Sequence, residues 1–144
     1  MADALYTARA HATGGRTGGG VKTDDGKLEL PVEPPTEIGG NGEGTNPEQL
    51  FAAGYAACFL SALKLVSAKR DVPADDASVY ADVDLLSAGR GFALAVSLRV
   101  TMPGVEQEQA QKMAENAHEV CPYSNATRGN IEVDLSVEQP AAAG

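Results

Sequence analysis

The sequence predicts an α+β domain of 144 residues. Residues alternate between apolar and polar near both ends of the chain, as they do in strands, and a long helical pattern lies between these regions. Strands and helices are therefore segregated, without the regular βαβ alternation of a parallel sheet. Because this length suits one ordinary domain, we expect residues 1–144 to form a single domain with a frayed tail over 138–144.

The first 30 residues predict a small hairpin or β-meander. Two weakly alternating pieces, ALYTARAHA and KLEL, are accompanied by GGRTGGG and DDGK, which supply turn positions with positive φ. A loop rich in Pro and Gly, PVEPPTEIGGNGEGTN, follows over residues 31–46. Loops of this length inside compact domains are commonly functional or mobile, so this one is of interest because it leads into the main helix.

That helix begins with a clear capping pattern. Asn46 is a good N-cap, Pro47 suits the first turn, and Gln49 has the spacing of a capping-box partner. From residue 50 to residue 63 the pattern is apolar on nearly every face, which is typical of a helix buried all round. A single domain of this size has too little chain to surround such a helix, so we expect a homodimer.

The strand pattern returns in VYADVDLL (79–86) and FALAVSLRV (92–100), which the turn SAGRG joins into a hairpin with one buried face. The segment EQEQAQKMAENAHEVC then predicts a helix with an inward stripe made of Ala110, Met113, Ala114, Ala117 and Cys121. Pro122 ends this helix or begins another turn, and IEVDLSV (131–137) predicts a closing strand.

Charge and composition narrow the functional classes. The formal net charge is −9, and no cluster of Lys and Arg offers a phosphate-binding surface, so we expect no nucleic-acid partner. The N-terminus lacks the pattern of a secretory signal, and the apolar segment 50–63 is shorter than the ~20 residues that span a membrane. We therefore expect a cytoplasmic protein without a membrane partner, in which a structural disulfide is not required.

The two cysteines, Cys58 and Cys121, are the candidate reactive groups. Each is ordinarily explained as a small buried hydrophobe, since free cysteine is among the most buried residue types. Their separation of 63 positions resembles no local redox motif, so only the fold can bring them together. The segment CPYSNATRG after Cys121 offers a possible helix turn whose amide groups would favour a thiolate.

A reactive Cys58 needs a cation nearby, because apolar surroundings raise the pKa of a thiol and make it inert. Arg16, alone in a glycine-rich loop, is the candidate that we favour, and Glu48 in the first turn of the helix is its candidate partner. Helix geometry places Glu48 ~15 Å from Cys58 along the axis, so a long arginine would have to bridge part of the gap. The ordinary alternatives are a solvated loop charge and a residue that favours the helix dipole.

A zinc site is a further alternative. His118 and Cys121 are three positions apart on one helix, so both can face the same ion. Cys58, however, sits in mid-helix and His11 in a weak strand, without the paired ligand spacing that zinc sites usually show. We therefore expect no metal.

Two long segments, TNPEQLFAAGYAACF and VCPYSNATRGNIEVDL, resemble the organic hydroperoxide resistance (Ohr) proteins of the OsmC/Ohr family. The resemblance extends from the first strand pieces to residue 137 and includes GGRTGGG and VSLRVTMPG. It implies an OsmC-like α+β fold in which two chains intertwine, with antiparallel sheets packed around central helices. It also implies a thiol peroxidase with no bound cofactor, metal or haem.

Carried over by residue, the resemblance implies that Cys58 is the peroxidatic thiol and Cys121 the resolving thiol. Arg16 would stabilise the Cys58 thiolate, and Glu48 would orient Arg16. A sulfenic acid on Cys58 would condense with Cys121 to form an intramolecular disulfide. The resemblance further implies that dihydrolipoyl groups (dihydrolipoamide or lipoylated proteins) regenerate the thiols.

The apolar residues of the helix predict the class of substrate. A pocket walled by Phe51, Tyr55 and Phe59 would gain ~0.8 kcal/mol for each buried methylene, whereas hydrogen peroxide has nothing apolar to bury. We therefore expect alkyl and fatty-acid hydroperoxides to be preferred. A redox sensor or an apolar-ligand binding protein of the same fold is the alternative to an enzyme, and turnover distinguishes them.

Overall fold

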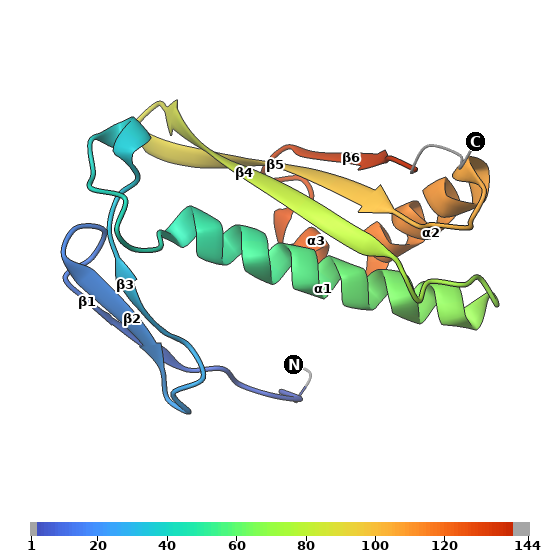
Figure 1. Ribbon diagram of the computed structural model, residues 1–144, viewed down its shortest axis with the longest axis horizontal. Coiled ribbons are helices and arrows are strands. Elements are labelled where there is room, and N and C mark those ends of the chain that lie inside the picture. Colours follow the sequence, from blue (N-terminus) through green and yellow to red (C-terminus); the bar gives the residue numbers. More distant parts are fainter. Residues whose placement is uncertain (1–2, 140–144) are drawn as a thin grey trace. The chain divides into compact units, whose positions relative to one another are not determined.

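The structure is a computed structural model that describes residues 3–139, and the chain divides into two compact units, residues 1–50 and 51–144. Each unit contains one three-stranded sheet, and most of the helical residues belong to the second unit (Figure 1). The predicted α+β class is therefore confirmed.

The first unit is built around an antiparallel meander of β1 (Ala10–Thr13), β2 (Gly19–Thr23) and β3 (Glu29–Val32), in that order. The register pairs Ala12 with Val21 and Val21 with Leu30. The meander predicted from the sequence is present, because its turns fall where glycine and aspartate punctuate the apolar pieces.

The turn between β1 and β2 carries Arg16 and depends on its glycines. Gly14, Gly15 and Gly18 all have positive φ, where other residues are strained. A side chain at Gly19 would place its Cβ 2.1 Å from the carbonyl oxygen of Gly15. Only glycines therefore allow this tight turn, with Arg16 near its middle.

The long loop between β3 and the main helix is more ordered than the sequence suggests. It contains one 3₁₀ turn, η1 (Thr36–Ile38). Thr45 forms an isolated parallel bridge with Val32, and its N–H donates to the Pro31 carbonyl at 2.8 Å. These backbone bonds fix the chain just before the helix starts.

Helix α1 (Pro47–Lys69) begins as the sequence predicts, with one difference. The Gln49 N–H donates to Asn46 Oδ1 at 2.9 Å, so Asn46 is the N-cap. The Gln49 side chain does not return to the Asn46 backbone as a capping box requires; its Oε1 accepts a bond from Thr45 Oγ1 at 2.9 Å. The Thr45 hydroxyl lies close enough to take that acceptor, which sequence spacing does not reveal.

One chain buries only one face of α1. The buried side consists of Tyr55, Phe59, Ala62, Leu63, Val66 and Ser67. The other side exposes apolar residues, among them Ala53, Ala57 and Leu65. With 23 residues, α1 is longer than the segment 50–63 and is apolar enough, by length and composition alone, to cross a membrane. Its buried face belongs to the core of the second unit, as in the central helix of a globular domain.

The second unit contains the sheet of β4 (Ser78–Ala88), β5 (Gly91–Thr101) and β6 (Val133–Val137). β4 and β5 form the predicted antiparallel hairpin, and β6 pairs in parallel with β5, as Val96 with Val133. The parallel pairing is possible because two helices, α2 (Gln107–Val120) and α3 (Pro122–Thr127), connect β5 to β6 (Figure 1).

The core of the second unit lies between this sheet and the helices. Val96, Leu98 and Val100 of β5 are buried, as the alternation predicts, whereas Phe92 at the start of the strand is exposed. The predicted stripe of α2 is also buried: Ala110, Met113, Ala114, Ala117 and Cys121. On the outer face, the Arg99 guanidinium lies 4.2 Å from the centre of the Tyr80 ring.

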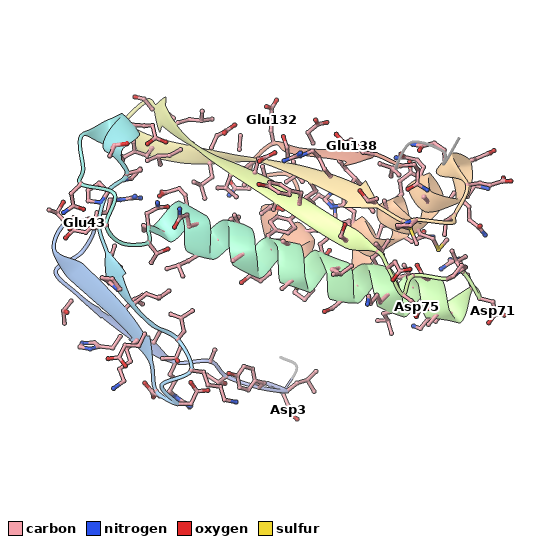
Figure 2. All side chains as sticks on the ribbon, in the orientation of Figure 1. Asp3, Glu43, Asp71, Asp75, Glu132 and Glu138 are labelled. Carbon is pink, nitrogen blue, oxygen red and sulfur yellow. The ribbon has the colours of Figure 1, made fainter. Side chains whose placement is uncertain are left out.

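The tail predicted to be frayed over 138–144 is only partly described, because residues 140–144 lie outside the described residues. Glu138 donates its N–H to the Val100 carbonyl at 2.8 Å, so the chain remains attached to β5 just past β6. Figure 2 labels acidic residues that lie in loops and beside strand ends: Asp3, Glu43, Asp71, Asp75, Glu132 and Glu138.

Candidate functional site

The two cysteines meet in the second unit. Cys58, in the middle of α1, is half-buried, and Cys121, between α2 and α3, is completely buried. The Cys121 thiol donates to Cys58 Sγ across 3.7 Å, and both thiols are free. A disulfide requires the sulfurs to approach to about 2.05 Å, so the two thiols are neighbours that are not bonded.

Cys121 reaches this position because it is the joint between two helices. It is the C-cap of α2 and the N-cap of α3, with an extended backbone at φ −65° and ψ 125°. Pro122 then occupies the first turn of α3, where its missing N–H has no cost. The next N–H group in the chain, that of Tyr123, acts to lower the pKa of the Cys58 thiol.

Three influences act on the Cys58 thiol. Burial raises its pKa, the Tyr123 amide lowers it, and the neighbouring Cys121 raises it, leaving the pKa above its ordinary value. The amide alone therefore does not make Cys58 a thiolate at neutral pH, and a reactive sulfur needs a further positive group.

The predicted pairing of Arg16 with Glu48 is present in the first unit. The Arg16 guanidinium donates two bonds to the Glu48 carboxylate, at 2.9 Å and 2.8 Å, as a bidentate pair. These bonds raise the pKa of Arg16 and lower that of Glu48. The Arg16 side chain is 47% exposed, compared with 14% for Glu48, so the carboxylate is the more enclosed partner. The predicted contact between Arg16 and Cys58 stays a prediction.

A largely apolar cavity of about 580 Å³ lies in the second unit, and neither cysteine lines it. Pro122 and Tyr123, which directly follow Cys121, line it. The remaining lining residues come from α1, β5 and the chain after Pro122: Phe51, Phe92, Ala93, Leu94, Ala126, Thr127, Asn130 and Ile131. The cavity can therefore accommodate an apolar group next to the segment that follows Cys121.

Of the three aromatic residues predicted to wall a pocket, only Phe51 lines this cavity. Tyr55 and Phe59 are completely buried in the core instead. Four positions along a helix correspond to about 400°, so each step from Phe51 to Tyr55 to Phe59 rotates about 40° further toward the core. The sequence also gave no sign of Phe92, Leu94 or Ile131, because these come from β5 and the chain before β6.

Gly54 is a site residue that the sequence did not reveal. A Cβ at this position would lie 2.6 Å from the Tyr123 hydroxyl oxygen. The ring of Tyr123 lies 5.8 Å from that of Phe51 and 5.5 Å from that of Tyr55, measured between centroids. The missing side chain thus admits the tyrosine whose amide acts to lower the pKa of Cys58. A lone glycine within a helix pattern was the available signal.

A buried chain of polar groups lies next to the thiols. The Tyr55 hydroxyl is 2.8 Å from Ser124 Oγ and 3.2 Å from Thr127 Oγ1. Ser124 Oγ is also 2.8 Å from Nδ1 of His118. Burial and the nearby Arg128 lower the pKa of His118, whereas Glu119 opposes them. These hydrogen bonds therefore link α1, α2 and α3, and the lowered pKa favours the neutral form of the imidazole.

In the described part of the chain, the side chains that could bind zinc are not grouped as a zinc site requires. Within residues 3–139, no group of three or more His, Cys, Asp and Glu side chains is arranged to hold a metal ion. Of the two predicted ligands on one helix, His118 hydrogen-bonds to Ser124 and Cys121 to Cys58.

Comparisons with known proteins match this chain over most of its length. The family model for OsmC-like protein matches residues 40–136. The organic hydroperoxide resistance protein of Xanthomonas axonopodis pv. citri is 49% identical over 136 residues, which cover 92% of this chain and 94% of that protein.

Two solved structures share the fold. An organic hydroperoxide resistance protein from Elizabethkingia anophelis, with thiocyanate bound, is 50% identical with a TM-score of 0.91, covering 96% of this chain and 100% of that one. Another from Vibrio cholerae, with captopril bound in one of its active sites, is 48% identical with a TM-score of 0.88, covering 94% of this chain and 93% of that one.

Proposed function

This chain belongs to the OsmC-like protein family and, within it, to the organic hydroperoxide resistance proteins, and from that membership we propose that it is a cysteine-based peroxidase of organic hydroperoxides. The family supports a role in resistance to organic peroxides. The observation that carries the finer proposal is the meeting of two free thiols, 63 positions apart, at 3.7 Å.

In the first step, the Cys58 thiolate attacks the terminal oxygen of the hydroperoxide. The O–O bond breaks, the alcohol leaves after taking a proton, and Cys58 becomes a sulfenic acid. The Tyr123 amide acts to lower the pKa of this thiol. Because burial raises the pKa of Cys58, we assign Arg16 as the cation that stabilises the thiolate, with Glu48 holding the guanidinium through its two bonds.

In the second step, the Cys121 thiol condenses with the sulfenic acid. The S–O bond breaks, an S–S bond forms, and the thiol proton leaves with the hydroxyl group as water. The buried position of Cys121 supports this role, because it keeps other thiols away and leaves Cys58 as its nearest reaction partner. A dithiol then reduces the disulfide, and we assign dihydrolipoyl groups as this external reductant.

The cavity supports an organic substrate. Its lining combines Phe51, Leu94 and Ile131 with the Tyr123 ring, which follows Cys121 by two positions. Each methylene buried there contributes about 0.8 kcal/mol, so an alkyl or fatty-acid hydroperoxide binds better than hydrogen peroxide.

A homodimer is the proposed assembly, and the cytoplasm the proposed location. The exposed apolar side of α1, with Ala53, Ala57 and Leu65, supports a partner chain because one chain leaves this side uncovered. In the intertwined arrangement expected from the family, a second copy covers it.

The proposal is tested by steady-state turnover of cumene hydroperoxide with dihydrolipoamide, compared with hydrogen peroxide and with thioredoxin as reductant. We expect multiple turnovers, a preference for the organic substrate, and complete loss in Cys58→Ser. In Cys121→Ser, mass spectrometry after peroxide treatment should find Cys58 as a sulfenic or higher acid. Full activity in Cys58→Ser would refute the assignment, and a single reduced equivalent per thiol pair would indicate the redox sensor instead.

A further inference from the structure

Two parallel contacts join α1 to the segment that begins at Cys121. One is the thiol contact between Cys58 and Cys121; the other is the 2.8 Å hydrogen bond between Tyr55 and Ser124. Tyr55 lies three positions before Cys58 on α1, and Ser124 lies three positions after Cys121. Three positions are close to one helical turn, so the hydroxyl bond lies one turn away from the thiols.

His118 extends the second contact across the joint between the helices. It lies on α2, three positions before Cys121, and its Nδ1 is 2.8 Å from the hydroxyl of Ser124 on α3. The hydrogen bond between His118 and Ser124 therefore joins a residue before Cys121 to a residue after it. Because Cys121 is the only residue between α2 and α3, this bond restricts the angle at which the two helices meet.

The hydroxyl groups of this hydrogen-bonded chain are buried, whereas His118 is half-buried, so the hydroxyl bonds are the geometrically demanding part. Tyr55 and Ser124 are completely buried, and Thr127, the second partner of Tyr55, is 5% exposed. A buried polar group that loses its partner destabilises the folded state, because no water replaces the lost bond. A shift of α3 relative to α1 would break several of these hydrogen bonds at once. The hydrogen bonds therefore strongly favour one placement of the segment that begins at Cys121.

We infer that Tyr55, Ser124 and His118 are positioning residues for the resolving thiol: their hydrogen-bonded chain holds Cys121 against Cys58 and so promotes the disulfide. None of the three touches the reacting oxygen in this scheme, and they act through the placement of Cys121. The kinetic part of the inference rests on the proposed peroxidase function, whereas its equilibrium part requires only the two thiols.

The physical basis is the effective concentration of one thiol at the other. If a substitution removes one of these hydrogen bonds, the reduced protein samples more placements of α3. Forming the disulfide must then remove this added freedom. The disulfide then becomes less stable and forms more slowly. Attack of the Cys58 thiolate on the hydroperoxide does not involve Cys121, so this step keeps its rate.

The equilibrium test needs no peroxide. Tyr55→Phe and Ser124→Ala each remove one hydroxyl group, and the dithiol–disulfide equilibrium is measured in buffers of reduced and oxidised glutathione. Oxidised glutathione accepts the two electrons of the thiol pair and is released as two reduced molecules. We expect the equilibrium constant for the disulfide to fall about tenfold in each variant, a shift of about 30 mV toward easier reduction.

Two matched control substitutions each remove one hydroxyl group that takes no part in the hydrogen bonds among Tyr55, Ser124 and His118. Ser67→Ala deletes a completely buried hydroxyl for which the described residues provide no hydrogen-bond partner. Tyr80→Phe deletes the hydroxyl of an exposed tyrosine on β4. Both should leave the equilibrium unchanged. The double variant Tyr55→Phe/Ser124→Ala should lose less than the sum of the single losses, because both substitutions break the same bond.

The kinetic test is a single turnover with one equivalent of cumene hydroperoxide. Hydroperoxide consumption should keep its wild-type rate in Ser124→Ala, while disulfide formation slows and dimedone captures more sulfenic acid on Cys58. If the wild-type protein forms the disulfide from oxidised glutathione but consumes no hydroperoxide, the proposed function fails, and the equilibrium measurement still decides the inference.

Three results would overturn the inference. One is an unchanged dithiol–disulfide equilibrium in both Tyr55→Phe and Ser124→Ala, even if their melting temperatures fall. The hydrogen bonds would then stabilise the fold without positioning Cys121. Another is full additivity in the double variant. The last is a wild-type protein whose thiols form no disulfide in oxidised glutathione, because Cys121 would then not be held in a reactive position.

Discussion

The ion pair of Arg16 and Glu48 and the hydroxyl chain of Tyr55, Ser124 and His118 both join segments far apart in the sequence, but their surroundings differ. The ion pair has a guanidinium that is 47% exposed, so water and salt screen it. In the hydroxyl chain, Tyr55 and Ser124 are completely buried and His118 is half-buried. An exposed pair contributes about 0–1 kcal/mol to stability, whereas a broken buried bond costs about 1–3 kcal/mol.

This difference separates two tasks that a thiol peroxidase requires. A cation that stabilises a transient thiolate need not hold the fold together, and an exposed arginine can change partners at little cost in stability. A thiol that must meet another thiol needs a fixed position, which buried hydrogen bonds provide. We therefore expect changes in the buried region to affect stability, and changes in the ion pair to affect reactivity.

The largest effect should come from closing the space next to Tyr123. Gly54→Ala places a Cβ 2.6 Å from the Tyr123 hydroxyl oxygen, so the ring must shift. Alanine would otherwise stabilise a helix by about 1 kcal/mol relative to glycine. Overpacking costs about 1–3 kcal/mol, so we expect a net loss in the free energy of unfolding, measured by urea denaturation.

The control for Gly54→Ala is the same substitution in the Tyr123→Phe background. Removing the hydroxyl relieves the shortest contact, although a ring carbon of Tyr123 would still lie 3.1 Å from the new Cβ. The loss should therefore be smaller in this background. Stabilisation by Gly54→Ala in the wild-type protein would contradict the close packing of Tyr123 on α1.

A smaller effect should follow from protonation of His118. Burial and then Arg128 lower its pKa, so the folded protein binds this proton less readily than the unfolded chain. Stability is therefore complete above the ordinary histidine pKa of about 6.5 and falls as the pH drops through that value toward the lower folded pKa. Denaturant midpoints measured from pH 7.5 downward should show this decline.

The contribution of His118 is isolated by two glutamine variants. His118→Gln should flatten the pH dependence, whatever its effect on absolute stability. His11→Gln, at an exposed position on β1, should leave the slope as in the wild type. An equal slope in the wild type and in His118→Gln would show that this imidazole is not kept neutral by the fold.

The smallest effect on stability, with a large effect on reactivity, is expected for Arg16→Ala. The free energy of unfolding should change by less than about 1 kcal/mol, and less still in high salt. Because Arg16 lowers the pKa of Glu48, the stabilisation is present above the ordinary glutamate pKa and is lost as the pH falls through the folded pKa. The pKa of the Cys58 thiol, followed by thiolate absorbance against pH, should rise.

Two further variants sharpen this result. Glu48→Ala should raise the Cys58 pKa by less than Arg16→Ala, because the arginine remains but loses its anchor. Arg9→Ala removes another exposed arginine of the first unit and should leave the thiol unchanged. If Arg16→Ala titrates like the wild-type protein, Arg16 does not act on the thiolate.

Local signals in the sequence were enough for most of the elements. Alternation identified the meander and the hairpin of β4 and β5, and Asn46 identified the start of α1, because these features depend on neighbouring residues. The need for a cation beside a buried thiol pointed to Arg16 and Glu48, which do pair. The family resemblance assigned roles to the two cysteines, which do meet.

The faces of α1 show where local signals end. The helix is apolar nearly all round, so its sequence does not tell which side meets a sheet, a cavity or a second chain. The structure places Phe51 at the cavity and Tyr55 and Phe59 in the core. The same ambiguity hid Gly54, whose function depends on Tyr123, 69 positions away in the chain.

By itself, the sequence determined most of the helices and strands, and it singled out two candidate reactive thiols and the candidate pair of Arg16 and Glu48, which the structure does bring together. Only the tertiary structure decided that β6 lies parallel to β5, that Gly54 admits Tyr123, and that Tyr55, Ser124 and His118 share one hydrogen-bonded chain. The reason is physical: periodicity and capping encode which way a residue faces, whereas the packing of distant segments decides what it meets there.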